Sequence, residues 1–121
     1  MIVGLGVDVV DVARVEALLA RHGERFLARC FADREVLRPG DAGHLAGLVA
    51  AKEATFKALG TGWDRGVGWR QVVVRRSEAG APELELGDAA RRRATALGVS
   101  RALVSISHDA GVAVAVVVLE A

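Results

Sequence analysis

The chain has 121 residues, of which 52% are apolar and only 4% aromatic, with 16 basic and 15 acidic side chains. This length fits one domain, and the near balance of charge argues against a dedicated nucleic-acid binder, whose surface should be strongly basic. The longest uncharged apolar run, 110–119, is about half the ~20 residues that a membrane-spanning helix needs. The apolar content exceeds what one small core can hide, which favours an oligomer.

Cysteine usage and the first residues predict a cytoplasmic protein. Cys30 is the single cysteine, so no disulfide can form within the chain, and no cluster of Cys and His has the spacing of a zinc site. The N-terminal residues lead directly into a strand-like segment, without the basic region that begins a signal peptide. We therefore expect a reducing compartment, with no membrane attachment.

Hydrophobic periodicity predicts a single α+β domain over 1–121, in which a mostly antiparallel sheet packs with one long helix and shorter helices. The expected strands are 2–10, 71–75, 83–86, 102–107 and 111–119. The expected helices are 12–22, 24–29, 41–59 and 88–96. Asp11 and Asp88 are expected to cap helices, Gly60 and Gly62 to close the longest one, and 108–110 to form the last turn.

The first predicted strand has two different faces. The apolar face, which we expect to be buried, consists of Val3, Leu5, Val7 and Val9. The other face carries Gly4, Gly6 and Asp8, where the glycines permit close approach of a ligand or of another backbone. A buried Asp8 would need a cation or hydrogen bonds. A role for Asp8 as a helix cap or at a strand end is the alternative.

The longest predicted helix carries both lysines of the chain. Its apolar stripe consists of Leu45, Val49, Phe56 and Leu59. Glu53 and Lys57, four residues apart beside this stripe, fit a surface ion pair and equally a carboxylate for Mg²⁺ with an ammonium for phosphate. Lys52 falls on the stripe itself, where it must snorkel, meet an anion or lie at an interface, and we take it as a second sign of an oligomer.

The segment from Ser105 to Asp109 places two hydroxyls on one strand face and ends with His108. Adjacent strand residues point to opposite faces, so these side chains cannot form a Ser/His/Asp hydrolase triad. A polar strand end and a phosphate or nucleotide contact both remain open. The chain has neither a GxGxxG nor a GxxxxGK[ST] loop.

Three separated blocks point to a known family. The blocks are Gly4-Leu-Gly-Val-Asp8-Val-Val-Asp-Val-Ala-Arg14-Val-Glu16, Ala50-Ala-Lys52-Glu53-Ala-Thr-Phe-Lys57-Ala-Leu-Gly60-Thr-Gly62 and Val104-Ser-Ile-Ser107-His108. In this order and spacing the chain resembles the holo-[acyl-carrier-protein] synthases, the small 4'-phosphopantetheinyl transferases of fatty-acid synthesis and lipid metabolism. The resemblance covers essentially the whole chain, including Phe31-Ala-Asp-Arg-Glu35, which is similar to the family's Phe-Thr-x-x-Glu segment.

The resemblance implies the 4'-phosphopantetheinyl transferase fold and a Mg²⁺-dependent transfer of phosphopantetheine from coenzyme A to a serine of apo acyl carrier protein. Adenosine 3',5'-bisphosphate is the other product, and the family implies a homotrimer with sites at or near subunit boundaries. The implied roles are Mg²⁺ ligation by Asp8 and Glu53, phosphate binding by Lys57, nucleotide contacts by Ser107 and His108, and carrier docking by Arg14, extended by Arg21 and Arg25. Asp8, Glu53, Lys57 and His108 are thereby the catalytic candidates.

Several alternatives stay open beside the resemblance. The serine proton could pass to Glu53, to Asp109 or to a metal-bound water. The family commonly has Arg-Phe where this chain has Leu48-Val49, and a basic residue inside the turn that is Gly80-Ala81-Pro82 here. Both departures remove positive charge that could serve coenzyme A phosphates or a subunit contact. A same-family transferase serving polyketide or peptide synthase carriers, or a non-catalytic coenzyme A or nucleotide-binding module, are the alternative functions.

Overall fold

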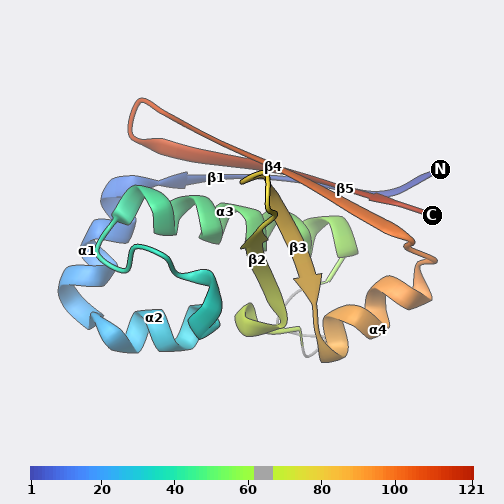
Figure 1. Cartoon of the computed structure of the whole chain (residues 1–121), viewed down its shortest axis with the longest axis horizontal. Coiled ribbons are helices and arrows are strands. Elements are labelled where there is room, and N and C mark those ends of the chain that lie inside the picture. The colour runs from blue at the N-terminus through green and yellow to red at the C-terminus, as the bar shows by residue number, and fades with distance from the viewer. Residues whose placement is uncertain (62–66) are drawn as a thin grey trace.

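A computed structural model of the chain describes residues 1–61 and 67–121, so Gly62 lies outside the described residues. The predicted α+β class is confirmed (Figure 1). The elements in chain order are β1 (Ile2–Asp11), α1 (Val12–His22), α2 (Glu24–Cys30), the 3-10 turn η1 (Asp33–Glu35), α3 (Ala42–Leu59), the 3-10 turn η3 (Trp69–Gln71), β2 (Val72–Arg76), β3 (Pro82–Leu86), α4 (Asp88–Ala96), β4 (Arg101–Asp109) and β5 (Val112–Glu120).

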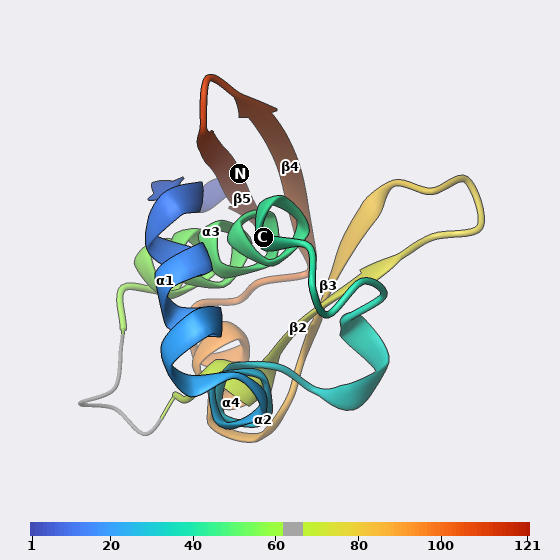
Figure 2. The same cartoon turned by 90° about the vertical axis from the view of Figure 1, so that its left-hand side faces the viewer.

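The strands form two antiparallel sheets. The larger has the order β1-β5-β4, and β2 pairs with β3 in a separate hairpin. Helices α1 to α4 lie on one side of the larger sheet (Figure 1), and the β2–β3 hairpin projects to the side away from α1 (Figure 2). Helix α3 lies between the larger sheet, α1 and β2, and thus at the centre of the domain.

Helix α3 has the predicted start and end. The Asp41 side chain accepts a hydrogen bond from the backbone N–H of His44 at 3.1 Å, and Gly60 ends the helix with a left-handed φ of 66°. The stripe residues Leu45 and Leu59 are fully buried. No helix in the described part of the chain combines the length and the apolar character that crossing a membrane requires.

The glycine face of β1, rather than its apolar face, packs against α3. A Cβ atom on Gly6 would overlap the carbonyl of Ala54, so the helix backbone can lie this close only to a strand without side chains. The apolar side chains turn outward, and their exposed fractions are 66% for Leu5, 52% for Val7 and 61% for Val9. The prediction that this apolar face is buried was wrong within the single chain, because α3 packs closely against the other face.

Lys52 meets an anion inside its own chain. Its ammonium donates to Glu35 Oε1 at 2.6 Å and to the carbonyl of Trp69 at 2.9 Å, and both charged side chains are fully buried. Glu35 also accepts the backbone N–H groups of Ala32 and Val74, each at 2.8 Å. The use of Lys52 as a sign of an oligomer was therefore wrong, because an internal carboxylate explains its position.

Two local predictions were also wrong. Asp88 does not cap α4, because it is the first helical residue, with a φ of 44°, and Gly87 occupies the cap position. The last hairpin turns at Ala110 and Gly111, so 108 and 109 complete β4. Both turn residues have positive φ, as a two-residue hairpin of this twist requires.

Candidate active site

Asp8, Glu53 and Lys57 meet where β1 crosses α3. Lys57 Nζ lies 3.2 Å from Asp8 Oδ1 and donates to the carbonyl of Val7 at 3.0 Å. The Asp8 side chain is only 17% exposed, and it does not cap α1, since Asp11 accepts the cap hydrogen bond instead. The structure therefore brings the three predicted residues together from two elements that are far apart in sequence.

The two carboxylates of this cluster suit a divalent cation. Burial raises the pKa of Glu53, the negative charge of Asp8 raises it further, and Lys57 and Arg14 oppose this shift. Mg²⁺ is usually held by one or two carboxylates and completed by water and substrate phosphates. No group of three or more His, Cys, Asp or Glu side chains gathers in the described ranges, so Asp8 and Glu53 are the protein donors that fit this ion.

A cavity of about 380 Å³ adjoins the cluster, with Asp8, Glu53 and Arg14 in its lining. The rest of its wall is mostly apolar and includes Val15, Leu18, Phe26, Val49 and Trp69. Apolar walls exclude water, and charged groups interact more strongly where water is excluded. The cluster can thus act on a charged group held against the mostly apolar wall of this cavity.

His108 lies in a second cavity, of about 290 Å³, on another side of α3. Its Nε2 donates to the carbonyl of Gly43 at 2.9 Å. A Cβ atom on Gly47 would lie 2.8 Å from this nitrogen, so the glycine lets the ring approach the helix. The two cavities have different linings, with Leu48 in one and Val49 in the other.

Ser107 and His108 point to opposite faces of β4. Ser107 lies with Ser105 and Asp109 on the exposed outer face of the sheet, whereas His108 faces α3. The strand therefore separates the two side chains. Because β4 is an edge strand, a ligand can contact both of them only by lying across the edge of the sheet. The alternation of the strand predicted correctly that both hydroxyls share one face.

The predicted docking arginines are exposed on α1 and α2. Arg14 and Arg21 are seven residues apart and so lie on one face of α1. Arg25 of α2 lines another cavity together with Leu18, Phe26, His22 and Arg29. His22 and Arg29 were not among the predicted docking residues, although the spacing of Arg25 and Arg29 places them one helical turn apart.

Three residues of the His108 cavity were also missed, namely Arg38, His44 and Arg76. They come from the segment before α3, from its first turn and from the end of β2. No local motif links these positions, so only the tertiary fold reveals that they share a cavity.

Comparison with known proteins agrees with these features. The profile of the 4'-phosphopantetheinyl transferase superfamily matches residues 4–117. The holo-[acyl-carrier-protein] synthase of Solidesulfovibrio magneticus is 51% identical over 99% of both chains. The crystal structure of the Neisseria meningitidis synthase matches with a TM-score of 0.89 and 32% identity over 100% of both chains.

A second solved structure contains a ligand. The Helicobacter pylori holo-[acyl-carrier-protein] synthase, in complex with coenzyme A, has a TM-score of 0.86 and 33% identity over 96% of this chain and 99% of that one. The likeness thus extends over the whole fold and over the blocks that contain Asp8, Glu53 and Lys57. The chain belongs to the holo-[acyl-carrier-protein] synthases of the 4'-phosphopantetheinyl transferase superfamily.

Proposed function

We propose that this chain transfers 4'-phosphopantetheine from coenzyme A to a serine hydroxyl of apo acyl carrier protein, with Mg²⁺, in cytoplasmic fatty-acid biosynthesis. The observation that carries the proposal is the meeting of Asp8, Glu53 and Lys57 beside a cavity that Asp8 and Glu53 line. The names of its relatives, and the coenzyme A complex of the Helicobacter pylori protein, support the same reaction.

The reaction requires charge neutralisation and positioning rather than a covalent enzyme intermediate. The serine oxygen attacks the phosphorus that bears pantetheine, a new P–O bond forms, and the bond to the 5'-phosphate of adenosine 3',5'-bisphosphate breaks. Bound to Asp8 and Glu53, Mg²⁺ would neutralise the diphosphate charge. Lys57 holds a phosphate oxygen with its ammonium.

The serine proton needs an acceptor close to the reacting oxygen. Glu53 lines the cavity beside Asp8, so it can take the proton directly or through a water. Asp109 lies on the outer face of the sheet, whereas Asp8 shares the opposite face of β1 with the glycines that contact α3. This placement favours Glu53 over Asp109 within one chain.

The His108 cavity is the proposed site of the nucleotide half of coenzyme A. Its lining is rich in basic side chains and contains His108 itself. Because β4 is an edge strand, a nucleotide lying over that edge can meet both His108 and Ser107.

A mass measurement tests the reaction. Apo acyl carrier protein incubated with this chain, coenzyme A and Mg²⁺ should gain the mass of one phosphopantetheine group, and a chelator should prevent the gain. An unchanged carrier mass at saturating Mg²⁺ would contradict the proposal. Parallel reactions with polyketide and peptide synthase carriers distinguish the same-family alternative, and tight coenzyme A binding without turnover would support the non-catalytic one.

We further propose that Arg14, Arg21 and Arg25 dock an acidic carrier protein. Arg21→Glu should raise the KM for the carrier about tenfold at low salt and change kcat little, because exposed charges steer and orient a partner. Arg92→Glu on α4 changes the same charge at an exposed site and should have no such effect. Equal effects of the two substitutions would show a general charge effect instead of a docking site.

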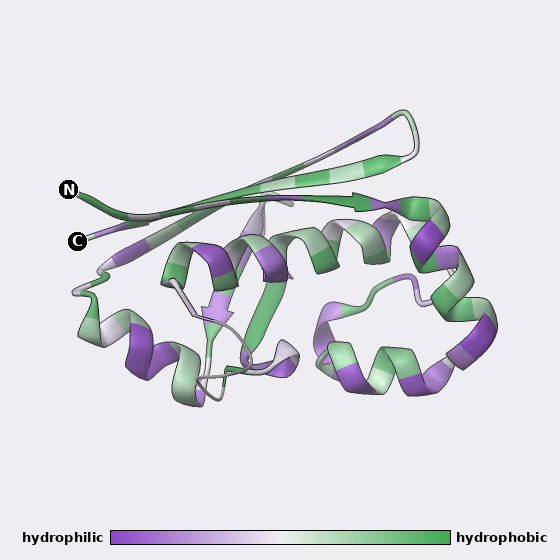
Figure 3. Ribbon diagram, turned by 180° about the vertical axis from the view of Figure 1, so that it is seen from behind, coloured by the Kyte–Doolittle hydropathy of each residue, from purple (hydrophilic) through white to green (hydrophobic). Residues whose placement is uncertain are grey.

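The outer face of the larger sheet is the proposed trimer interface. Its exposed large apolar side chains are Leu5, Val7, Val9, Leu103 and Val116. Figure 3 shows that β1 and β5 are hydrophobic along much of their length, and the helices of the described chain all lie on the other side (Figure 1). An apolar patch of this kind is typical of a protein–protein contact.

Val7→Asp should therefore dissociate the oligomer. Val7 is 52% exposed, and a carboxylate there would be buried without a partner in a subunit contact. Light scattering should give the mass of three chains for the unaltered protein and of one chain for the variant. Leu37→Asp alters another exposed apolar residue, 63% exposed and outside the sheet, and should leave the mass unchanged. A monomeric unaltered protein would refute the trimer.

A further inference from the structure

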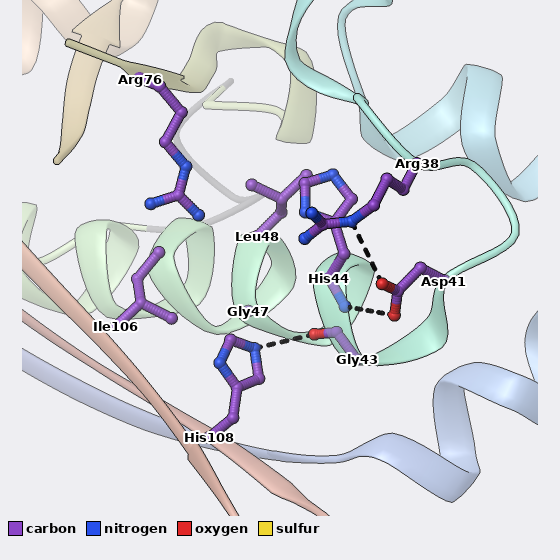
Figure 4. A pocket seen from close by; sticks show the side chains of 9 residues that line it. All are labelled: Arg38, Asp41, Gly43, His44, Gly47, Leu48, Arg76, Ile106 and His108. Atoms are coloured by element: carbon purple, nitrogen blue, oxygen red, sulfur yellow. Dashed lines mark hydrogen bonds and ion pairs between the residues drawn. The ribbon is translucent and has the colours of Figure 1, made fainter. Parts of the chain in front are cut away.

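The cavity that contains His108 collects basic side chains from four segments of the chain (Figure 4). They are Arg38, His44, Arg76 and His108. Among the described residues of the lining, Asp41 is the one carboxylate. A concave site with this composition is suited to an anion.

Three of the four basic groups already have partners within the protein. Arg38 Nε lies 3.2 Å from Asp41 Oδ2, which compensates its charge. His44 Nε2 accepts a hydrogen bond from the backbone N–H of Leu37 at 3.2 Å, so this nitrogen carries no proton, and burial together with Arg38 lowers the pKa of the ring. A backbone carbonyl of α3 accepts the hydrogen bond of His108. Of the two arginines in the lining, Arg38 pairs with a carboxylate and Arg76 does not.

Arg76 supplies a positive charge without a carboxylate partner. No acidic side chain in the described ranges lies within ion-pair distance of it, whereas the preceding Arg75 pairs with Glu83 at 3.1 Å. The guanidinium of Arg76 extends toward α3 (Figure 4) and donates one long hydrogen bond, of 3.3 Å, to the carbonyl of Gly80. Most of its five N–H donors therefore remain for a ligand.

Arg76 also lies beside both positions at which this chain lacks an expected basic residue. Leu48 lines the same cavity as Arg76. Ala81 directly follows Gly80, the hydrogen-bond acceptor of Arg76. One arginine at the end of β2 thus restores positive charge to the region where the two substitutions remove it.

The position of the cavity indicates which phosphate it meets. Coenzyme A has a diphosphate, which must lie at Asp8 and Glu53 for the proposed transfer, and a separate phosphate on the ribose 3' oxygen. Along the axis of α3, Glu53 lies about 14 Å and Lys57 about 20 Å beyond His44, at ~1.5 Å per residue. The 3'-phosphate is therefore the anion that remains for this cavity. The cavity and the cluster that binds the diphosphate can come from the same chain or from two neighbouring copies.

We propose that Arg76 binds the ribose 3'-phosphate of coenzyme A and so sets the preference of this chain for coenzyme A over dephospho-coenzyme A. The inference rests on the proposed function. A planar guanidinium offers paired N–H groups that match two phosphate oxygens. A site built for such a group discriminates strongly against a ligand that lacks it, because its charge then stays unpaired.

The test compares the two donors with Arg76→Ala, Arg76→Lys and the control Arg75→Ala. Arg76→Ala should raise the KM for coenzyme A about tenfold, with kcat within about twofold, because the lost contact binds a group remote from the reacting bond. The KM for dephospho-coenzyme A should not change, so the preference between donors shrinks by the same factor. Arg76→Lys should restore part of it, and Arg75→Ala should behave as the unaltered protein.

Two results would overturn the inference. One is an unchanged KM for coenzyme A in Arg76→Ala, and the other is an equal increase for both donors. Calorimetric binding of adenosine 3',5'-bisphosphate provides a second measurement that requires no transfer, and Arg76→Ala should weaken it about tenfold. If the unaltered protein transfers no phosphopantetheine, the proposed function fails, while this binding comparison still decides the role of Arg76.

Discussion

Asp8→Asn should slow phosphopantetheine transfer by about 10³-fold, because a metal-held diphosphate loses several kcal/mol of charge stabilisation when one of two carboxylate donors is removed. The substitution keeps the shape of the side chain and removes only its charge. The ion pair that it breaks involves Lys57, which is 55% exposed, so the free energy of unfolding should fall by less than about 1 kcal/mol. Initial rates and urea unfolding measure the two effects separately.

The Mg²⁺ dependence of the rate distinguishes a metal ligand from a residue that only binds substrate. Asp8→Asn and Glu53→Gln should each raise the Mg²⁺ concentration that gives half the maximal rate. Asp109→Asn removes a carboxylate from the outer sheet face and should retain activity within about twofold. Near-normal transfer by Asp8→Asn would refute the metal assignment, and a large loss with Asp109→Asn would make Asp109 the proton acceptor.

Local sequence patterns predicted the helices and strands well because their signals act over a few residues. Asp41 and Gly60 mark the two ends of α3, and the structure has the helix between them. The spacing of Glu53 and Lys57 likewise placed them on one side of that helix. The grouping of Asp8 with these two residues followed from the resemblance to a family, since no local pattern connects β1 with α3.

The remaining features depend on which surfaces pack together. Alternation along β1 separated an apolar face from a glycine face, but it could not show that α3 packs against Gly6 and leaves Val7 exposed. Arg76 lies in the His108 cavity because β2 pairs with β3 and this hairpin lies beside α3. Periodicity cannot predict such long-range contacts, because it depends only on residues within one helix or strand.

The buried pair of Lys52 and Glu35 is a further long-range feature, and it has the largest expected effect on stability. Lys52→Met should lower the free energy of unfolding by about 3–5 kcal/mol, because it leaves the carboxylate of Glu35 buried without a cation. Burial lowers the pKa of Lys52, and Glu35 opposes this shift. The ammonium also donates to the carbonyl of Trp69, which lines the cavity beside Asp8.

A second substitution separates charge from packing. In Lys52→Met with Glu35→Gln no buried charge remains, and the amide oxygen can still accept a backbone N–H from Ala32 or Val74. The double variant should therefore be more stable than Lys52→Met alone. Urea unfolding at neutral pH measures both, and a double variant no more stable than the single one would show that lost packing, and not an unpaired charge, causes the destabilisation.

Lys57→Met provides the matched control on the same helix. Lys57 is 55% exposed and also faces a carboxylate, that of Asp8, but water screens this pair, so the free energy of unfolding should change by less than about 1 kcal/mol. Replacing the two lysines of the chain should thus have different effects, one on transfer and the other on stability. Loss of Lys57 should reduce transfer and leave the fold stable, because its ammonium is the proposed phosphate contact. Loss of Lys52 should destabilise the fold, because its ammonium joins η1 to β2 through the core.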